Sequence, residues 1–256
     1  MRHIQILSVI IFAAIVLTGC KERLYQPDPE SYPDLFPLVK GSSFVYNVDS
    51  LDAAGNPFAI GKAHVSLRDT ASFLNTVYTT MSDSLVLTSE TIVNRTYIRK
   101  TNAGIYYFID TTGLGALIPD TLKRFTTVDG EISALTAPPI TGRNWNAYKF
   151  IAGIFSVISL TAEYGNEETL FMNLNGTGRD IRTRKVNYTL RITIPPQQQG
   201  GTPVQFTFNG SGWFSENIGL VKLEGDSVLF GFIGGDITNL FTNQYKVRRT
   251  LTEYSF

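Results

Sequence analysis

Alternation of apolar and polar residues is the feature that most restricts the fold of this chain. Between residues 186 and 194 every second side chain is apolar, and Asn, Thr or Arg stands at each position between. Successive side chains of a strand point to opposite sides, so a period of two indicates a strand with one buried face. The pattern recurs at residues 59–68 and 204–208, whereas helical periodicity is scarce. We therefore expect an all-β protein.

Further strand candidates follow one another along the chain, separated by Gly, Asn, Asp and Pro. They lie at residues 43–49, 73–81, 91–99, 104–110, 148–163, 219–224, 226–233 and 244–252. Roughly ten or more short strands without βαβ alternation predict one antiparallel β domain, either a half-barrel of lipocalin-like shape or a sandwich. The most apolar internal run, Phe150–Leu160, is expected to be a strand buried on both faces, with a short core helix as the alternative.

The N-terminus has the layout of a secretory signal peptide. A basic start precedes an apolar stretch, Ile4–Leu17, which is shorter than the ~20 residues that a membrane-spanning helix needs. The next residues complete Leu17-Thr18-Gly19-Cys20, which resembles the lipobox of bacterial lipoproteins. The resemblance implies cleavage before Cys20, transfer of diacylglycerol to its thiol and acylation of the new amine. An ordinary signal peptide with a chance cysteine is the alternative.

The expected organisation is a signal peptide at 1–19, a lipidated Pro-rich tether at 20–37 and a β-rich domain at 38–256. Lys21-Glu22 loosely resembles a signal that sends some Bacteroidetes lipoproteins to the cell surface, and a merely polar tether explains it as well. We therefore expect the protein in the cell envelope, as an outer-membrane lipoprotein on the periplasmic or the surface face.

Two further segments resemble secreted, often lipidated proteins of the Bacteroidetes. One is Phe36-Pro37-Leu38 followed by Gly41 and an aromatic residue, and the other is Gly219-Leu220-Val221-Lys222 after an aromatic segment. The resemblance implies an antiparallel sheet curled into a half-barrel or lipocalin-like shape. It implies no catalytic residue.

Composition excludes several classes of function. The 22 basic and 22 acidic residues give no net charge, which argues against nucleic acid as a partner. One cysteine and two histidines exclude a thiolate or histidine-rich metal site. A Gly-x-Ser-x-Gly elbow, a P-loop and a dinucleotide fingerprint are absent, and His64 stands on the polar side of its strand. We predict no catalytic residues, no metal and no cofactor.

Two weaker patterns name candidate site residues. Arg182 and Arg184 share the register of the apolar positions that begin at Val186, so they are candidates to contact an anionic ligand, with a solvated strand end as the alternative. Asp followed by Ser or Thr and then an aliphatic residue or Thr occurs six times, where about one is expected by chance. This triplet resembles the O-glycosylation motif of exported Bacteroidetes proteins, and turn chemistry explains it equally well. Its hydroxyl residues are Ser50, Thr70, Ser84, Thr111, Thr121 and Ser227.

These observations predict a membrane-anchored, non-enzymatic lipoprotein that binds a ligand or an envelope protein partner, or serves as a structural module. A carrier of lipid or another apolar ligand in a β half-barrel is the alternative, and a hydrolase with an unidentified site is third. An open apolar cavity would favour the carrier. An interior filled with side chains would favour the binding or structural module.

Overall fold

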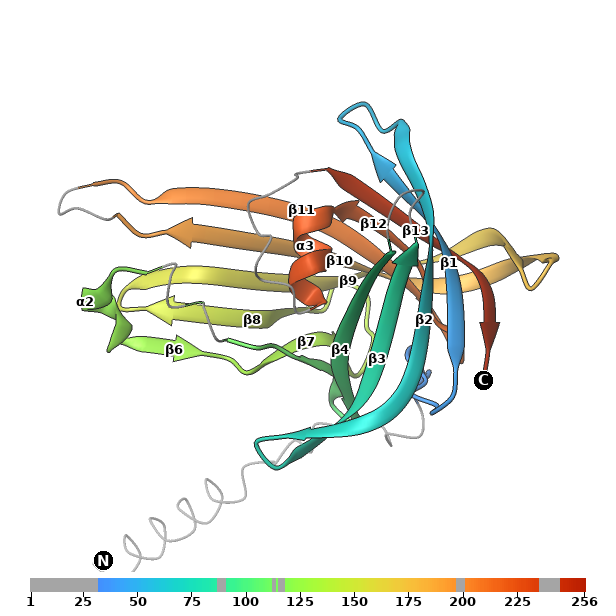
Figure 1. Ribbon diagram of the computed structural model, residues 1–256, viewed down its shortest axis with the longest axis horizontal. Helices are drawn as coiled ribbons and strands as arrows, with labels where there is room; N and C mark the ends of the chain where they lie inside the picture. The colour runs from blue at the N-terminus through green and yellow to red at the C-terminus, as the bar shows by residue number, and fades with distance from the viewer. Residues whose placement is uncertain (1–31, 87–90, 112–113, 115–117, 197–200, 235–244) are drawn as a thin grey trace, which may run out of the picture. The chain divides into compact units, whose positions relative to one another are not determined.

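Antiparallel strands of the described chain form one continuous sheet in the computed structural model (Figure 1). The structure describes residues 32–86, 91–111, 114, 118–196, 201–234 and 245–256. Residues Met1–Tyr32 and Pro33–Phe256 form separate units, and the sheet belongs to the second. Cys20 and the signal peptide lie outside the described residues.

The described elements are strands almost throughout, with two short helices. They are β1 (Ser43–Leu51), β2 (Pro57–Phe73), β3 (Thr76–Val86), β4 (Thr91–Thr101), β5 (Gly104–Phe108), α2 (Asp120–Lys123), β6 (Thr126–Val128), β7 (Glu131–Thr136), β8 (Asn144–Ala152), β9 (Phe155–Leu174), β10 (Thr177–Ile194), β11 (Val204–Ser215), β12 (Gly219–Asp226), α3 (Ser227–Ile233) and β13 (Lys246–Ser255).

The strand order is β6-β8-β9-β10-β11-β12-β13-β1-β2-β3-β4-β5-β7. Most neighbours are consecutive hairpins, and β1 closes the middle of the sheet by pairing with β13 from the other end of the chain. The longest hairpin, β9–β10, turns at Asn175 and Gly176, which both have positive φ. This is the type I′ turn that the right-handed twist of paired strands favours.

The all-β prediction is confirmed, and the sheet is not closed into a barrel. The apolar residues of the alternation at 186–194 are buried in β10, as predicted: Val186, Tyr188, Leu190 and Ile192. The alternation at residues 204–208 belongs to β11, which pairs with β10 from Ile194 and Val204 onwards.

Two predictions of secondary structure were wrong. The run Phe150–Leu160 is not one buried strand: β8 ends at Ala152, Gly153 turns with positive φ, and Ile154 is 93% exposed before β9 begins. Residues 226–233, predicted as a strand, contain helix α3. Both segments are short apolar runs, in which strand and helix cannot be separated by periodicity alone.

Helix α3 packs its apolar side onto the sheet. Val228, Leu229 and Phe232 are buried, at the spacing expected for one face of a helix. They join the larger of two hydrophobic clusters, whose members include Ile132 of β7 and Tyr148 of β8. The Phe232 and Tyr148 rings meet edge to face with centroids 5.2 Å apart. This side of the sheet is therefore filled.

The second hydrophobic cluster lies where the tip of β9–β10 reaches β13. Met172 and Leu174 of the hairpin are buried together with Leu251 of β13. The Asn175 backbone N–H donates to the Thr252 carbonyl oxygen at 2.8 Å. The segment before β1 also packs on the sheet, since the Phe36 ring lies 6.5 Å from Tyr107.

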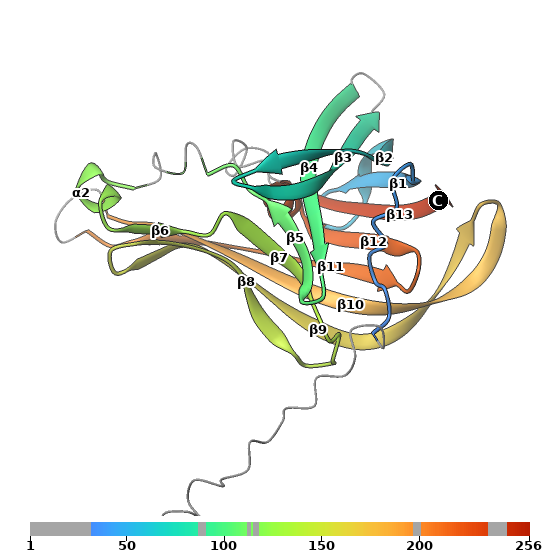
Figure 2. The same cartoon turned by 90° about the horizontal axis from the view of Figure 1, so that it is seen from below.

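The sheet curls until its last strand, β7, returns to the neighbourhood of β8 (Figure 2). No backbone ladder joins these two strands. Aromatic side chains from β8, β9 and β10 donate to backbone carbonyls of β7 instead, and we call this set the aromatic seam. Its bonds are Trp145 Nε1 to Ser133 O (2.7 Å), Tyr164 OH to Thr136 O (2.7 Å) and Tyr188 OH to Ala134 O (2.9 Å).

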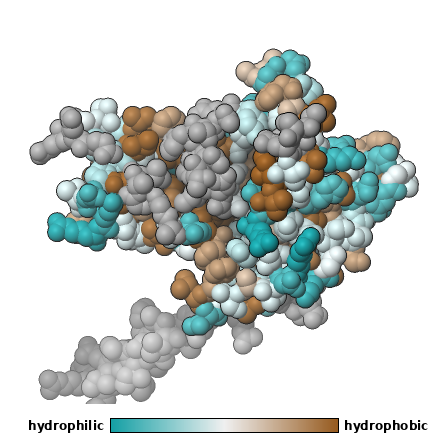
Figure 3. All heavy atoms as spheres, in the orientation of Figure 1, coloured by the Kyte–Doolittle hydropathy of each residue, from teal (hydrophilic) through white to brown (hydrophobic). Residues whose placement is uncertain are grey.

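Apolar side chains at the surface are dispersed. In the view of Figure 3, brown groups are separated by teal and white ones. The most exposed apolar side chains stand at hairpin turns or ends, as do Leu74, Ile154 and Phe171. Among the described residues, no helix has the length and apolar composition needed to cross a membrane.

Candidate binding cleft

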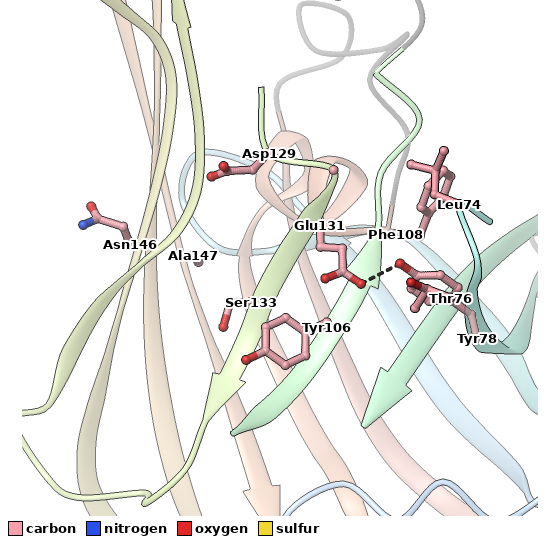
Figure 4. Close-up of a pocket in the computed structure, with 11 residues that line it drawn as sticks. Leu74, Thr76, Tyr78, Tyr106, Phe108, Asp129, Glu131, Ser133, Asn146 and Ala147 are labelled. Carbon is pink, nitrogen blue, oxygen red and sulfur yellow. Dashed lines mark hydrogen bonds between the residues drawn. The ribbon is translucent and has the colours of Figure 1, made fainter. Parts of the chain in front are cut away.

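A cleft of about 440 Å³ lies beside the aromatic seam, between the end of the β2–β3 hairpin, strands β5 and β7, and strand β8 (Figure 4). Its volume falls within the range of ~300–1,000 Å³ that is usual for small-molecule sites. The residues that line it are Leu74, Thr76, Tyr78, Tyr106, Phe108, Asp129, Gly130, Glu131, Ser133, Asn146 and Ala147.

Strand alternation aims these side chains into the cleft. On β7, Glu131 and Ser133 alternate with the buried residues Ile132 and Ala134. Glu131 and Ser133 therefore face the opposite side of the strand. Asn146 of β8 is exposed. Figure 4 shows Glu131, Ser133 and Tyr106 gathered along one wall, and Asn146 at the far rim on β8 with its amide turned away from them.

An aromatic cluster fixes the hairpin that borders the cleft. Leu74 and Asn75 take positive φ at the β2–β3 turn, which folds the hairpin end back. The Phe73 ring stacks on Phe108 of β5, with centroids 4.4 Å apart, and also contacts Tyr97. Because aromatic contacts add stabilisation beyond their buried area, this wall of the cleft is preformed.

Glu131 forms the strongest polar contact of the cleft. Its carboxylate accepts hydrogen bonds from the Tyr78 hydroxyl at 2.6 Å and from Nε of Arg99, and Nη2 of Arg99 bonds the second oxygen. Partial burial pushes the pKa of the Glu131 carboxyl upwards, but the bonds from Arg99 and Tyr78 outweigh it and hold the pKa below its usual value. Glu131 is therefore ionised and fully engaged, which suits a structural ion pair better than an acid–base catalyst.

Other polar groups of the cleft are free. The side chains of Thr76, Ser133 and Asn146 and the Tyr106 hydroxyl make no hydrogen bond to another described residue. Asp129 accepts one bond, from the Lys149 backbone N–H at 3.0 Å. These hydroxyl, amide and carboxylate groups are available to a ligand, and the described lining includes no lysine, arginine, histidine or cysteine.

The sequence-predicted candidates lie elsewhere. Both guanidinium groups of Arg182 and Arg184 bond the carboxylate of Glu167, and Arg184 also donates to the Thr141 hydroxyl at 2.6 Å. The hydrogen bond from Arg182 and the charge of Arg184 lower the pKa of Glu167 despite slight desolvation. His64 is exposed on β2. None of these residues lines the cleft.

The predicted glycosylation residues differ in exposure. Thr70 and Thr121 are exposed, and Ser84, Thr111 and Ser227 are half-buried. Ser50 is only 8% exposed on β1, so it offers little room for a glycan in the folded chain.

Sequence reasoning missed the cleft because its polar cluster is assembled from distant positions. Tyr78, Arg99 and Glu131 stand on β3, β4 and β7, and no spacing along the chain links them. The one available signal was the alternation of Glu131 and Ser133 with buried residues, which marks a polar strand face without saying what faces it. In the described part of the chain, no group of His, Cys, Asp and Glu is placed to hold a metal ion.

Comparison with known proteins finds two solved structures, both at low identity. No protein-family model matches the chain, and no curated protein matches it in sequence. A structure from Bacteroides fragilis, described as an exported protein with a YmcC-like fold, is 14% identical with a TM-score of 0.45, covering 86% of this chain and 98% of its own. One from Parabacteroides distasonis, described as a lipoprotein, is 14% identical with a TM-score of 0.40, covering 88% and 100%.

Proposed function

We propose that this chain is a membrane-anchored lipoprotein of the bacterial cell envelope whose β domain binds a ligand or partner without catalysis. The observation that carries the proposal is the cleft, in which free hydroxyl and amide groups stand beside a rigid aromatic wall. A few placed polar groups on a preformed wall are typical of binding sites.

The absence of catalysis is supported by the state of the acidic groups in the cleft. Glu131 is held ionised by Arg99 and Tyr78, and Asp129 is exposed and bonded to the backbone of Lys149. A nucleophile next to a base, or two carboxyl groups with pKa values pushed apart, would be expected of a hydrolase. The described residues that line the cleft form neither arrangement.

The filled side of the sheet favours this function over a carrier of lipid. Leu160 and Leu190 of the larger cluster are fully buried, and Phe232 of α3 packs among them. A carrier needs an apolar cavity of its own, whereas the described residues of this cluster are packed against one another.

The anchor is proposed from the lipobox resemblance at Cys20, and the outer membrane as its location from the residues that follow. Substitution Cys20→Ala should move the protein from the membrane fraction to the soluble fraction, because acyl chains contribute about 0.8 kcal/mol per buried CH₂. Lys21→Ala, one residue further, is the matched control and should stay with the membrane. Retention of the Cys20→Ala protein in the membrane would contradict the anchor.

Native mass spectrometry of the full protein from its own host tests the remaining parts. We expect an acylated mass, and we propose glycan additions at exposed triplets such as Thr70 and Thr121. A stoichiometric lipid beyond the anchor would support the carrier instead. A mass that shows only the acylated polypeptide would contradict glycosylation.

A further inference from the structure

We infer that the cleft binds a neutral polyhydroxylated ligand, namely a short oligosaccharide. This inference rests on the proposed binding function and names the ligand class for the same site.

The charge of the cleft disfavours an anion. Among the described residues that line the cleft, Asp129 and Glu131 are the charged ones. The ion pair with Arg99 compensates Glu131, so Asp129 leaves the cleft with an uncompensated negative charge. A phosphate, a uronic acid or an anionic lipid headgroup would meet this charge with no lining cation to offset it.

The free polar groups disfavour an apolar ligand. Ser133 of β7 and Asn146 of β8 both line the cleft, and in Figure 4 the Tyr106 hydroxyl lies beside Ser133. Covering such groups with an apolar surface would remove their water without replacing its hydrogen bonds, which costs several tenths to a few kcal/mol for each group. A ligand that carries many hydroxyl groups replaces those bonds.

Tyr106 adds an aromatic surface of fixed position. The Arg99 guanidinium lies over its ring, 4.3 Å from the centroid, and is itself held by Glu131. A sugar ring presents apolar C–H groups on its faces and hydroxyl groups at its rim. Arg99 covers one face of the Tyr106 ring, so the part of the ring that lines the cleft is what would contact the C–H groups, and the hydroxyl, amide and carboxylate groups beside it would bond the rim.

The aromatic seam argues against an extended peptide as the occupant. A peptide that adds to a sheet edge needs free backbone N–H and C=O groups. At β7 the carbonyls of Ser133, Ala134 and Thr136 already accept side-chain hydrogen bonds, and at β8 the N–H of Lys149 donates to Asp129. Recognition must then come from side chains, as it does for glycans.

The test uses the lipidated full chain in detergent on an array of neutral and acidic oligosaccharides of a few sugar units. We expect a signal on neutral members and none on uronic-acid members. The affinity for the best neutral member should change less than about twofold between low and high salt, since screening acts on charged partners only. A blank array, a signal confined to acidic members or a steep salt dependence would overturn the inference.

Variants locate the binding. Asn146→Leu and Tyr106→Leu should each raise the Kd about tenfold or more, the equivalent of one lost contact. Asn144→Leu is the matched control, because Asn144 is exposed on the same strand and does not line the cleft. It should change the Kd less than about twofold. Equal binding by all three variants would place the glycan elsewhere and overturn the inference.

Two further outcomes separate this inference from the proposed function. If an unstructured peptide library binds at the cleft and the glycan array is blank, the proposed binding function stands and the oligosaccharide is rejected as its ligand. Shortening of the bound oligosaccharide during incubation would instead reject the proposal of a non-catalytic module. Because Asn146 is exposed, its variant should fold even if Tyr106→Leu does not, so the test does not depend on one substitution.

Discussion

The two faces of β7 and β8 differ in almost every physical respect. On one face Ile132 and Tyr148 are fully buried, and the Tyr148 ring contacts Phe232 of α3. On the other, Glu131, Ser133 and Asn146 line an open cleft with free polar groups. On β7, one step along the strand therefore separates a residue that holds the fold, Ile132, from residues that line the cleft, Glu131 and Ser133. Substitutions on the first face should cost stability, and substitutions on the second should cost binding.

The largest effect should come from the filled face. Phe232→Ala removes a fully buried ring beside Tyr148 and should lower the free energy of unfolding by about 3–5 kcal/mol. Urea unfolding followed by far-ultraviolet circular dichroism measures it. Ile154→Ala, at an exposed turn, is the control and should change stability by less than about 0.5 kcal/mol. A small effect of Phe232→Ala would mean that α3 is not part of the core.

The aromatic seam should give the next effect. Burial raises the pKa of Tyr188 well above its ordinary value, so its hydroxyl remains a donor to the Ala134 carbonyl. Tyr188→Phe leaves that carbonyl without its partner and should cost about 2 kcal/mol. Tyr148→Phe is the matched control, because the Tyr148 hydroxyl is buried with no hydrogen-bond partner. Thermal unfolding should show that Tyr148→Phe is as stable as the wild type or more stable. Equal losses of stability in both variants would contradict a specific contribution of the Tyr188 hydrogen bond.

Glu131 belongs to the cleft face but also supports the wall, so its effect should be intermediate. Glu131→Gln removes the charge that pairs with Arg99 and should cost about 1.5 kcal/mol at neutral pH. The pKa of Glu131 is lowered in the folded state, so its stabilisation is present above the unfolded value of ~4.3 and is lost as pH falls below it. The difference in unfolding free energy between wild type and variant should therefore shrink from about pH 5 to pH 3. A constant difference would contradict this origin.

The smallest change in stability should come from the free groups of the cleft. Ser133→Ala and Asn146→Leu break no hydrogen bond to a described residue, and each should shift the unfolding free energy by less than about 0.5 kcal/mol. Thermal shift measurements in the absence of ligand are sufficient. A loss of more than about 1 kcal/mol in either variant would show that these side chains serve the fold, and the two faces would no longer differ as described.

Much of the fold could be predicted from the sequence because alternation is a local property. The buried residues of β10 follow directly from the pattern at 186–194. Residues 226–233 and the run Phe150–Leu160 could not be assigned, since a short apolar stretch fits a strand, a helix or a hairpin equally well. Only tertiary contacts, such as those of Phe232, decide among these structures.

The candidate site could not be predicted for a different reason. Arg99 and Glu131 meet because β4 and β7 pair with opposite edges of β5, and no short motif encodes that strand order and register. The predicted anion contacts at Arg182 and Arg184 are occupied by Glu167, a partner on the neighbouring strand that the register brings opposite Arg184. The anchor at Cys20 remains a prediction, because it lies outside the described residues.

The aromatic seam allows β7 to shift slightly relative to β8. A hydrogen-bonded ladder resists separation cooperatively, and a shift in it would turn side chains to the wrong face. The seam instead depends on Trp145, Tyr164 and Tyr188, whose side chains can follow a small displacement of β7 by rotating. Since β7 and β8 border the cleft, its width can adjust to an occupant while every backbone ladder keeps its register.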